Sequence, residues 1–367
     1  MSTTGSTIRV EHQSVRRQWS RFLLIALMSH IPLFIYPTLR LCDWLELSWW
    51  LTVLIVVPLT GSQVICRVYL RHKQGKWARS LRSVADFWLG MSPVLLMFLL
   101  LFEPIVLFTE LNPHIAAVWV LGLTLVSAFV GLLIAINPII KTIHLTSSKL
   151  KKPLRFVQIT DVHIGSRSRT FLEKVIFRLN RLNPDFVCIT GDFIDAADIQ
   201  ESELCSLKSI IGPVYFCLGN HEKYEDVDMI IQRLRNLGVN VLRSDAMHFR
   251  DDVQVLGIDD MEDPLQVEKE LKDIDLDPGV LKILLYHRPR GLEAAAEAGI
   301  DLTISGHTHN GQIFPFKFFV RRVFNRTEGM YQIGNSRQYV SQGTGTWGPV
   351  IRLGTRSEIT LFEFLPE

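Results

Sequence analysis

The sequence predicts a chain of two parts: a membrane region of about four transmembrane helices in residues 1–140, and an α/β (α+β) domain in residues 153–367, joined by a basic linker at 141–152. Three observations support this prediction. Long apolar runs fill the first part, whereas short apolar runs alternate with charged and turn residues in the second. In the second part, β-type runs alternate with amphipathic helical segments, and metal-ligating residue types follow the β-type runs. The length of 367 residues also favours two units.

Four apolar runs reach or approach the roughly 20 residues that a helix needs to cross a bilayer. They occupy residues 22–39, 47–66, 87–108 and 115–136. The first run resembles a signal peptide, but no small-residue cleavage site follows it, so we expect it to stay attached. Asp86 and Glu103 lie near the two ends of the third run, where a carboxylate can reach the interface, so we expect structural roles for both.

Lysine and arginine are concentrated before the first run, between the second and third runs, and after the fourth, while the other two loops contain only Arg40. By the positive-inside rule, the N-terminus, the middle loop and everything after residue 137 are predicted to be cytoplasmic. The five cysteines are expected to be buried small apolar residues, not a redox or zinc site, which fits a reducing compartment.

Five segments rich in aspartate, histidine and asparagine come directly after β-type runs. They are Asp161-Val162-His163 after 154–160, Gly191-Asp192 after 186–190, Gly219-Asn220-His221-Glu222 after 214–218, His287 after 282–286, and Gly306-His307-Thr308-His309 after 302–305. A helix is predicted after each of the first three segments, at 169–182, 201–211 and 226–237. Such an alternation forms a parallel or mixed sheet with ligands at the carboxyl ends of its strands, so the five segments should converge at one edge.

The remaining β-type runs complete the predicted domain. Val253–Ile258 is the clearest of them, and residues 330–333, 338–341 and 358–364 are predicted to be additional strands that complete a second sheet. The expected domain therefore has two mixed sheets flanked by helices.

A carboxylate that bridges two cations, flanked by histidines and an amide oxygen, suits manganese, iron or zinc better than calcium, which prefers mostly oxygen ligands. Two such cations about 4 Å apart can share a hydroxide nucleophile and clamp the oxygens of a phosphoryl group. The predicted chemistry is hydrolysis of a phosphate ester or anhydride. A single aspartate or histidine at a strand end is usually a turn or cap residue, so the prediction depends on the whole ordered set.

The ordered motifs DxH, GDxxD, GNHE, a lone histidine and GHTH resemble those of the calcineurin-like metallophosphoesterases, in particular their bacterial membrane-associated branch, over residues 153–365. The resemblance implies two divalent metal ions, with manganese foremost and iron, zinc or magnesium as alternatives. It implies a first metal held by Asp161, His163, Asp192 and His309. It implies a second held by Asp192, Asn220, His287 and His307, with Asp192 bridging the two.

The same resemblance implies roles for two further residues, His221 and Asp195. His221 matches the family histidine that lies by the phosphate and protonates the leaving oxygen or stabilises its charge. Asp195 resembles the family aspartate that hydrogen-bonds this histidine and keeps it cationic. Where many family members have glycine after GHTH, this chain has Asn310, which we expect to keep the turn because asparagine tolerates a positive φ.

The segment after GHTH, residues 313–324, is rich in phenylalanine with interspersed lysine and arginine. It resembles a segment that inserts aromatic side chains into a membrane interface while its cations meet lipid phosphates. The residues predicted to contact the membrane are Phe316, Phe318, Phe319, Arg321, Arg322 and Phe324. The alternative is a core strand or helix that packs its phenylalanines inward. Arg288, next to a predicted ligand, is either a substrate-phosphate contact or an ordinary surface residue.

These expectations describe a membrane-anchored binuclear-metal phosphoesterase that hydrolyses phosphodiester or pyrophosphate bonds by a metal-bridging hydroxide, acting on a lipid-linked substrate. The protein would be integral to the bacterial inner membrane, with a cytoplasmic catalytic domain and no nucleic-acid partner. The alternative is a membrane sensor or transporter whose phosphoesterase domain is a regulatory output on a soluble nucleotide. A third class, the non-catalytic scaffold, is opposed by the complete ligand set.

Overall fold

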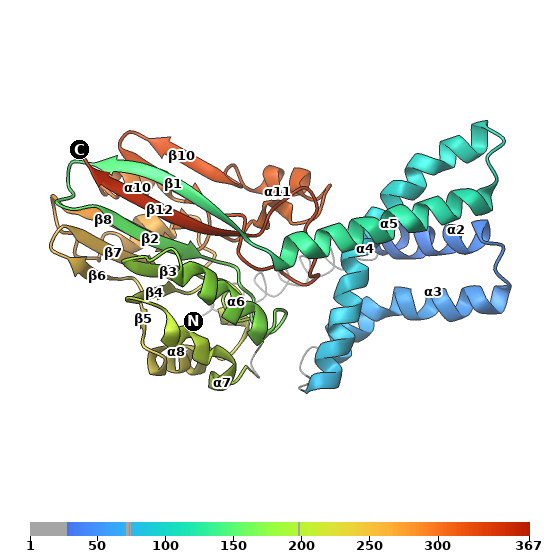
Figure 1. Ribbon diagram of the computed structural model, residues 1–367, viewed down its shortest axis with the longest axis horizontal. Helices are drawn as coiled ribbons and strands as arrows, with labels where there is room; N and C mark the ends of the chain where they lie inside the picture. Colours follow the sequence, from blue (N-terminus) through green and yellow to red (C-terminus); the bar gives the residue numbers. More distant parts are fainter. Residues whose placement is uncertain (1–27, 71–72, 74, 197–198) are drawn as a thin grey trace, which may run out of the picture. The chain divides into compact units, whose positions relative to one another are not determined.

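The computed structural model describes residues 28–70, 73, 75–196 and 199–367 (Figure 1). The chain separates into a helical unit and a unit of sheets and helices, with the boundary between Ala128 and Phe129. This boundary lies earlier than the predicted one, because the C-terminal unit includes the end of the last apolar helix and the residues expected to form a linker.

Helices make up the described part of the N-terminal unit. Their bounds are η1 Ile31–Ile35, α2 Tyr36–Trp44, α3 Trp49–Val64, η2 Ile65–Tyr69, α4 Lys76–Phe108 and α5 Pro113–Ile136. Within the described residues, three stretches are long and apolar enough to cross a membrane, namely Trp49–Tyr69, Trp77–Phe108 and Pro113–Ile136. The predicted run at 22–39 and the basic residues before it begin outside the described residues, so a fourth crossing and the orientation stay predictions.

The apolar side chains of α3 face outward. The helix has no buried residue, and Trp49, Leu54 and Val57 are exposed on it. A helix that is apolar on its exposed side as well as its packed side is typical of a membrane span. The surface of α3 therefore agrees with its apolar composition.

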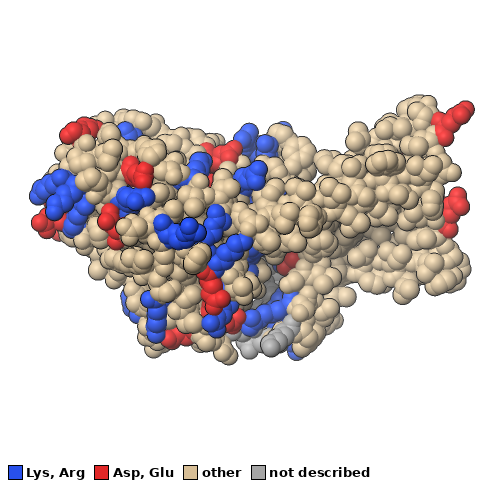
Figure 2. Space-filling model, in the orientation of Figure 1, with Lys and Arg blue, Asp and Glu red and all other residues tan. Residues whose placement is uncertain are grey.

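Charged side chains are few over the helical unit in the view of Figure 2, and arginines engage two of its acids, Asp86 and Glu103. Asp86 Oδ1 lies 2.6 Å from Arg67 Nη2, and Glu103 Oε1 lies 2.8 Å from Arg40 Nε. These ion pairs agree with the structural roles expected for both acids.

The cysteines differ from expectation at one position. All five are free, and Cys42, Cys66, Cys188 and Cys217 are buried, but Cys205 is exposed. Cys205 begins a 3₁₀ turn after a short surface helix, where a small apolar residue has no core to enter.

Two six-stranded sheets form the centre of the C-terminal unit, in the orders β1-β12-β2-β3-β4-β5 and β10-β11-β9-β8-β7-β6. The first contains β1 Ile139–Ser147, β2 Leu154–Ile159, β3 Phe186–Thr190, β4 Val214–Cys217, β5 Val239–Val241 and β12 Glu358–Pro366, and the second contains β6 Asp245–Arg250, β7 Val253–Ile258, β8 Leu281–Tyr286, β9 Leu302–Ser305, β10 Gly329–Ile333 and β11 Ser336–Val340. Each sheet mixes parallel and antiparallel pairs. The prediction of two mixed sheets is therefore confirmed.

Short helices connect the strands. Those along the first sheet are α6 Arg169–Asn180, α7 Glu201–Leu204 and α8 Val227–Asn236, and those along the second are α9 Gln266–Glu270, α10 Leu292–Glu297 and α11 Lys317–Val323. The helix predicted at 201–211 is shorter than expected, since α7 continues as the 3₁₀ turn η3 Cys205–Ser209. Leu172 of α6 and Leu234 of α8 share one buried core with Val187 and Phe216 of the first sheet.

Aromatic side chains fill the space between the two sheets. The ring of Phe156 stacks on those of Phe186 and Phe362, with centroids 4.9 and 4.8 Å apart. The same buried cluster includes Ile283 and Leu285 of the second sheet, so the sheets pack face to face. This rigid sandwich carries the loops in which the predicted ligands lie.

The structure departs from the prediction at β1 and β12. Residues 139–147, most of which were expected to form a basic linker, are the edge strand β1, and Ile143 and Leu145 pack against the inter-sheet core. The strand expected to complete the second sheet, β12, instead inserts into the first sheet between β1 and β2. Both departures come from pairings between segments about 200 residues apart, which local apolar patterns do not specify.

Candidate metal centre

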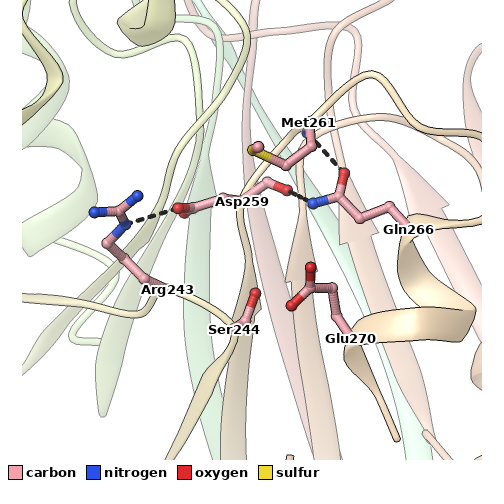
Figure 3. A pocket seen from close by; sticks show the side chains of 6 residues that line it. All are labelled: Arg243, Ser244, Asp259, Met261, Gln266 and Glu270. Atoms are coloured by element: carbon pink, nitrogen blue, oxygen red, sulfur yellow. Dashed lines mark hydrogen bonds and ion pairs between the residues drawn. The ribbon is translucent and has the colours of Figure 1, made fainter. Parts of the chain in front are cut away.

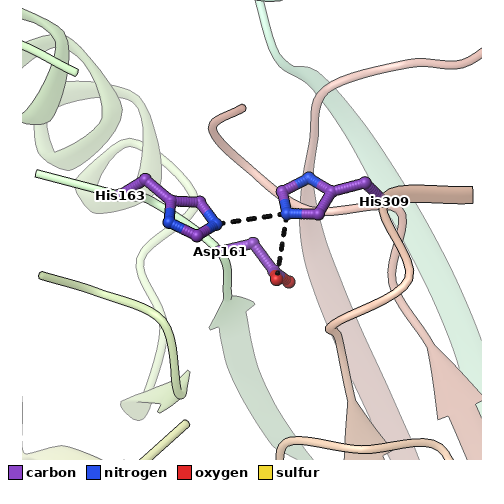
Figure 4. A group of neighbouring side chains, drawn as sticks. All are labelled: Asp161, His163 and His309. Carbon is purple, nitrogen blue, oxygen red and sulfur yellow. Dashed lines mark hydrogen bonds and ion pairs between the residues drawn. The ribbon is translucent and has the colours of Figure 1, made fainter. Parts of the chain in front are cut away.

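Three predicted ligands form a first group at the ends of β2 and β9. Ligand atoms of Asp161, His163 and His309 all lie within 4.8 Å of one another (Figure 4). The Nε2 atoms of His163 and His309 are 3.1 Å apart, and His309 Nε2 is 3.3 Å from Asp161 Oδ1. All three residues are buried. Two imidazole nitrogens and a carboxylate oxygen thus converge on one point.

Three more predicted ligands form a second group at the ends of β3, β8 and β9. Asp192 Oδ2 lies 3.1 Å from His287 Nε2, and His287 Nε2 lies 3.2 Å from His307 Nδ1. Asp192 also adjoins the first group, since its carbonyl accepts a hydrogen bond of 3.1 Å from the backbone N–H of His163. This position supports the bridging role predicted for Asp192, which stays a prediction.

Asn220 supplies a test of whether the site fits a metal. Its side chain is buried at 7% exposure, and its Oδ1 has no hydrogen-bond partner within the described part of the chain. A buried amide oxygen without a partner is costly in a folded protein and is accounted for if it ligates a cation. The residue types of the two groups, with this amide, form the mixed oxygen and nitrogen set that suits borderline divalent metals.

Asp192, His307 and His309 have pKa values shifted toward the forms that bind metal, whereas those of Asp161, His163 and His287 are raised. Burial lowers the pKa of His307 and of His309 well below the usual histidine value, so both imidazoles are neutral near pH 7. For Asp192, burial opposes ionisation, but interactions with His287, His221 and His163 together outweigh burial and hold the pKa well below its usual range. Neutral imidazoles and an ionised carboxylate are the forms that bind metal.

The backbone of the ligand loops adopts an unusual conformation. Five ligands have a positive φ: Asp161 (52°), His163 (56°), Asp192 (49°), His307 (73°) and His309 (45°). Left-handed backbone at such residues costs on the order of 1 kcal/mol or more each and is concentrated at functional sites. Asn310 also has a positive φ, 48°, which confirms the expected turn. The loops are therefore bent sharply so that the ligands face inward.

Two glycines permit this close packing. A Cβ on Gly219 would lie 2.2 Å from Asp192 Oδ1, and one on Gly306 would lie 2.2 Å from Asp161 Oδ2. Real Cβ atoms do not approach oxygen so closely, so any side chain here would displace a ligand carboxylate.

Glu222 is a residue of the site to which the sequence assigned no role. Its buried carboxylate accepts hydrogen bonds from the backbone N–H groups of Asp192 (3.0 Å), Phe193 (2.6 Å), Ile194 (3.0 Å) and Gly219 (2.8 Å). It therefore ties the loop of Asp192 to the loop of Asn220. The feature of the sequence that could have indicated this role is the position of Glu222 in the segment Gly219-Asn220-His221-Glu222.

Arg352 is a second such residue. It is fully buried, and its Nη2 donates to the carbonyls of Gln342 (2.6 Å) and Gly345 (2.8 Å) and lies 3.2 Å from His309 Nδ1. Gly345 N in turn donates to the carbonyl of Asp161 (3.0 Å). Arg352 thus supports the first group from behind. It lies far along the chain from His309, so no local pattern identified it.

His221 and Asp195 lie beside the first group. A ring nitrogen of His221, a carboxylate oxygen of Asp195 and a ring nitrogen of His163 are within 4.8 Å of one another. The carboxylate of Asp195 accepts hydrogen bonds from Ser166 Oγ (2.6 Å) and from the backbone N–H of Ser166 (3.0 Å), and it lies 3.5 Å from His163 Nδ1. Burial lowers the pKa of His221 to about 4, and the charge of Asp195 offsets this only in part. The cationic state predicted for His221 therefore does not follow from these contacts, and its acid role stays a prediction.

His221 also lies beside Asp192 of the second group. Its backbone N–H donates to Asp192 Oδ1 (2.8 Å), and its Nε2 lies 3.9 Å from Asp192 Oδ2. Its side chain keeps 19% exposure, in contrast to the fully buried ring of His287. His221 is thus partly open to solvent, unlike His287.

Arg288 is held by acids. Its Nε lies 2.6 Å from Asp260 Oδ2, and its Nη2 lies 2.8 Å from Glu262 Oε1. Arg288 is therefore not an ordinary surface residue. Its guanidinium is occupied by the two acids and is not free to bind a phosphate. The predicted phosphate contact stays a prediction that would require these pairs to open.

The predicted membrane segment forms helix α11 and its flanks. Helix α11 has no buried residue, and Phe318, Phe319 and Val323 are 52%, 63% and 65% exposed. Phe318 and Phe319 therefore do not pack inward, in contrast to the alternative of a core helix. Phe324, after the helix, contacts the metal centre instead, with its ring centroid 5.1 Å from that of His307.

A separate cavity of about 410 Å³ lies beyond β7 (Figure 3). It is lined by Arg243, Ser244, Asp259, Met261, Gln266 and Glu270. Arg243 Nε pairs with Asp259 Oδ2 at 2.8 Å, and Gln266 Oε1 accepts from Met261 N at 2.7 Å. Arg243, Asp259 and Gln266 are thus engaged with neighbouring groups, and the cavity contains none of the predicted ligands.

Two face-packed mixed sheets, with aspartate, histidine and asparagine gathered at the strand ends, form the layout expected of a metallophosphoesterase domain. The sequence profile of the calcineurin-like phosphoesterases matches residues 154–311, which contain all seven predicted ligands. The chain belongs to this family, as relatives over a longer range also show.

The relatives include uncharacterised and membrane proteins. The chain is 34% identical to an uncharacterised metallophosphoesterase of Campylobacter jejuni over 61% of this chain and 63% of that protein, so it spans less than two thirds of that relative's length. It is 31% identical to a transmembrane protein with metallophosphoesterase domain of Danio rerio, over 85% of this chain and 79% of that protein. It is 25% identical to the UDP-2,3-diacylglucosamine pyrophosphatase LpxG of Chlamydia trachomatis, over 58% of this chain and 84% of that protein.

Proposed function

We propose that this protein is a membrane-anchored phosphoesterase that hydrolyses a phosphodiester or pyrophosphate bond in a lipid-linked substrate. The observation that carries the proposal is the placement of the exposed aromatic and basic helix α11 beside the metal centre, through the contact of its C-cap residue Phe324 with His307. The ligand groups support the hydrolytic chemistry, and α11 supports the kind of substrate.

The residues of the centre fit the chemistry of phosphoryl transfer. Two divalent cations, with manganese first among them, would supply a nucleophile at neutral pH and neutralise charge on the phosphoryl oxygens. Asp161, His163 and His309 would hold one cation, and Asn220, His287 and His307 the other, with Asp192 between. His221, partly exposed beside Asp192, would donate a hydrogen bond to the phosphoryl or leaving oxygen.

Three observations support a lipid-linked substrate. Exposed aromatic residues on α11 cost free energy in water and gain it in a membrane interface. Arg322 is exposed on the same helix, where it can meet anionic lipid headgroups, while Arg321 pairs with Glu328 at 3.3 Å. A relative bears a name that describes a pyrophosphatase of a diacylated sugar nucleotide.

The three apolar helices and the transmembrane relative support membrane anchoring. We further propose that the protein resides in the bacterial inner membrane with the phosphoesterase domain in the cytoplasm, as the distribution of lysine and arginine indicates. Orientation can be tested by protease protection of the C-terminal domain in sealed membrane vesicles.

The test uses the full chain purified in detergent with manganese. Asp192→Asn should remove most hydrolysis of bis(4-nitrophenyl) phosphate while the thermal unfolding profile stays cooperative. The double variant Phe318→Ser/Phe319→Ser should lower turnover of a phospholipid or pyrophosphate-linked lipid in vesicles, with bis(4-nitrophenyl) phosphate turnover unchanged. Phe177→Ser, which removes a 64% exposed phenylalanine from α6, is the matched control.

Each part of the proposal has its own contradicting result. Normal phosphodiester hydrolysis by Asp192→Asn would reject the assigned centre. Equal vesicle turnover by the Phe318→Ser/Phe319→Ser variant and the wild type would reject α11 as the lipid contact.

A further inference from the structure

We propose that Arg290 forms an anion subsite beside the metal centre and recognises a second phosphate, or an equivalent oxyanion, of the substrate. This inference rests on the proposed function, since it takes the scissile phosphate to lie at the ligand groups. Arg290 follows the ligand His287 in the turn between β8 and α10.

A single aromatic ring connects Arg290 to the metal centre. Arg290 Cζ lies 5.3 Å from the ring centroid of Phe324, and that centroid lies 5.1 Å from the ring centroid of His307. A guanidinium that rests on an aromatic ring is held in position while its N–H groups remain available in the plane. Phe324 therefore positions the planar donor group of Arg290 near a ligand without consuming its hydrogen bonds.

The neighbouring arginines are neutralised, and Arg290 is not. Arg288 pairs with Asp260 and Glu262, and Arg326 Nη2 lies 2.6 Å from Glu293 Oε1. Across the described residues, the side chain of Arg290 has no acidic partner, and its contact is the ring of Phe324. An anion can bind Arg290 without first breaking an ion pair, which is not true of Arg288.

The position of Arg290 indicates which part of the substrate it meets. The ring of Phe324 contacts both the guanidinium of Arg290 and the ring of the ligand His307, so we assign Arg290 to a group further along the substrate than the scissile phosphate. Phe324 also directly follows α11. A substrate that places one phosphate at the metals, a second at Arg290 and an apolar chain along α11 is a pyrophosphate-linked lipid. Guanidinium and phosphate pair by two parallel hydrogen bonds, which a lysine does not reproduce.

The test compares ligands with one phosphate and with two. In excess manganese, UMP and UDP are measured as inhibitors of bis(4-nitrophenyl) phosphate hydrolysis by the full chain. Arg290→Met should weaken UDP inhibition by about tenfold or more while UMP inhibition changes by less than about twofold, because one charge-assisted contact is lost. Arg290→Lys should recover only part of the difference. Arg235→Met, an exposed site on α8, is the control and should match the wild type.

A second arm distinguishes a lipid phosphate from a free one. For a pyrophosphate-linked lipid in vesicles, Arg290→Met should raise KM with kcat nearly unchanged, and manganese content by elemental analysis should equal that of the wild type. Equal inhibition of variant and wild type by UDP would overturn the subsite, as would parallel weakening of UMP and UDP. A wild type without manganese-dependent phosphodiester hydrolysis would instead reject the proposed function itself.

Discussion

Glu222→Gln is the substitution that most directly tests how the ligand loops are held. The wild-type carboxylate accepts four backbone N–H groups, two at each oxygen. Glutamine has the same size but replaces one oxygen with an NH₂ group, so two of the four backbone donors would face another donor. A hydrogen bond to a charged group contributes about 1.5–3 kcal/mol. Relief of the buried charge offsets part of the loss, which leaves about 3 kcal/mol of destabilisation.

The assay is thermal unfolding of the full chain in detergent with and without manganese. For a domain of this size, a loss of about 3 kcal/mol corresponds to a decrease in Tm of about 6–12 °C. Manganese affinity should fall by about 10- to 100-fold, because the loops of Asp192 and Asn220 lose their shared anchor. Glu173→Gln, an exposed acid on α6 paired with Arg169, is the control and should change stability by less than about 1 kcal/mol. A Glu222→Gln variant with unchanged Tm and unchanged manganese binding would refute the reasoning.

Two further substitutions test other parts of the centre. Arg288→Met should destabilise the protein by about 3–5 kcal/mol, since it leaves the fully buried carboxylate of Asp260 without its partner, and Arg288→Met/Asp260→Asn should recover most of the loss in chemical denaturation. Additive losses in that double variant would show that the pair is not coupled. Arg352→Met should lower manganese affinity by about tenfold or more, measured by titration of the metal-free protein, because the loop behind Asp161 and His309 loses its buried anchor. Unchanged affinity would limit Arg352 to a purely structural role.

The sequence predicted those features that depend on short stretches of chain. The buried strands before Asp161, Asp192 and His287 are mostly apolar runs, and a ligand at the end of each lies at the same edge of the sandwich because the strands run parallel. The turn at Asn310 likewise follows from the conformational tolerance of one side chain. Such features need no knowledge of distant residues.

The features that could not be predicted depend on contacts between distant segments. Arg352 reaches His309 across the loop of Gly345, and no property of the sequence around Arg352 indicates that contact. The free guanidinium of Arg290 and the paired one of Arg288 are equivalent in sequence, since only the fold places Asp260 beside one of them. The partner of Asp195 is likewise set by the loop geometry, which brings it against His163.

The insertion of β12 between β1 and β2 sets an order for the synthesis of the protein. Strand β1 follows the last apolar helix directly, yet its neighbour in the sheet is β12, so it has no partner until residues 358–366 have left the ribosome. The helices of the N-terminal unit are made long before that moment. Membrane insertion can therefore precede completion of the first sheet, and a nascent chain halted before β12 would carry its ligand loops on a sheet that lacks both β12 and a paired β1.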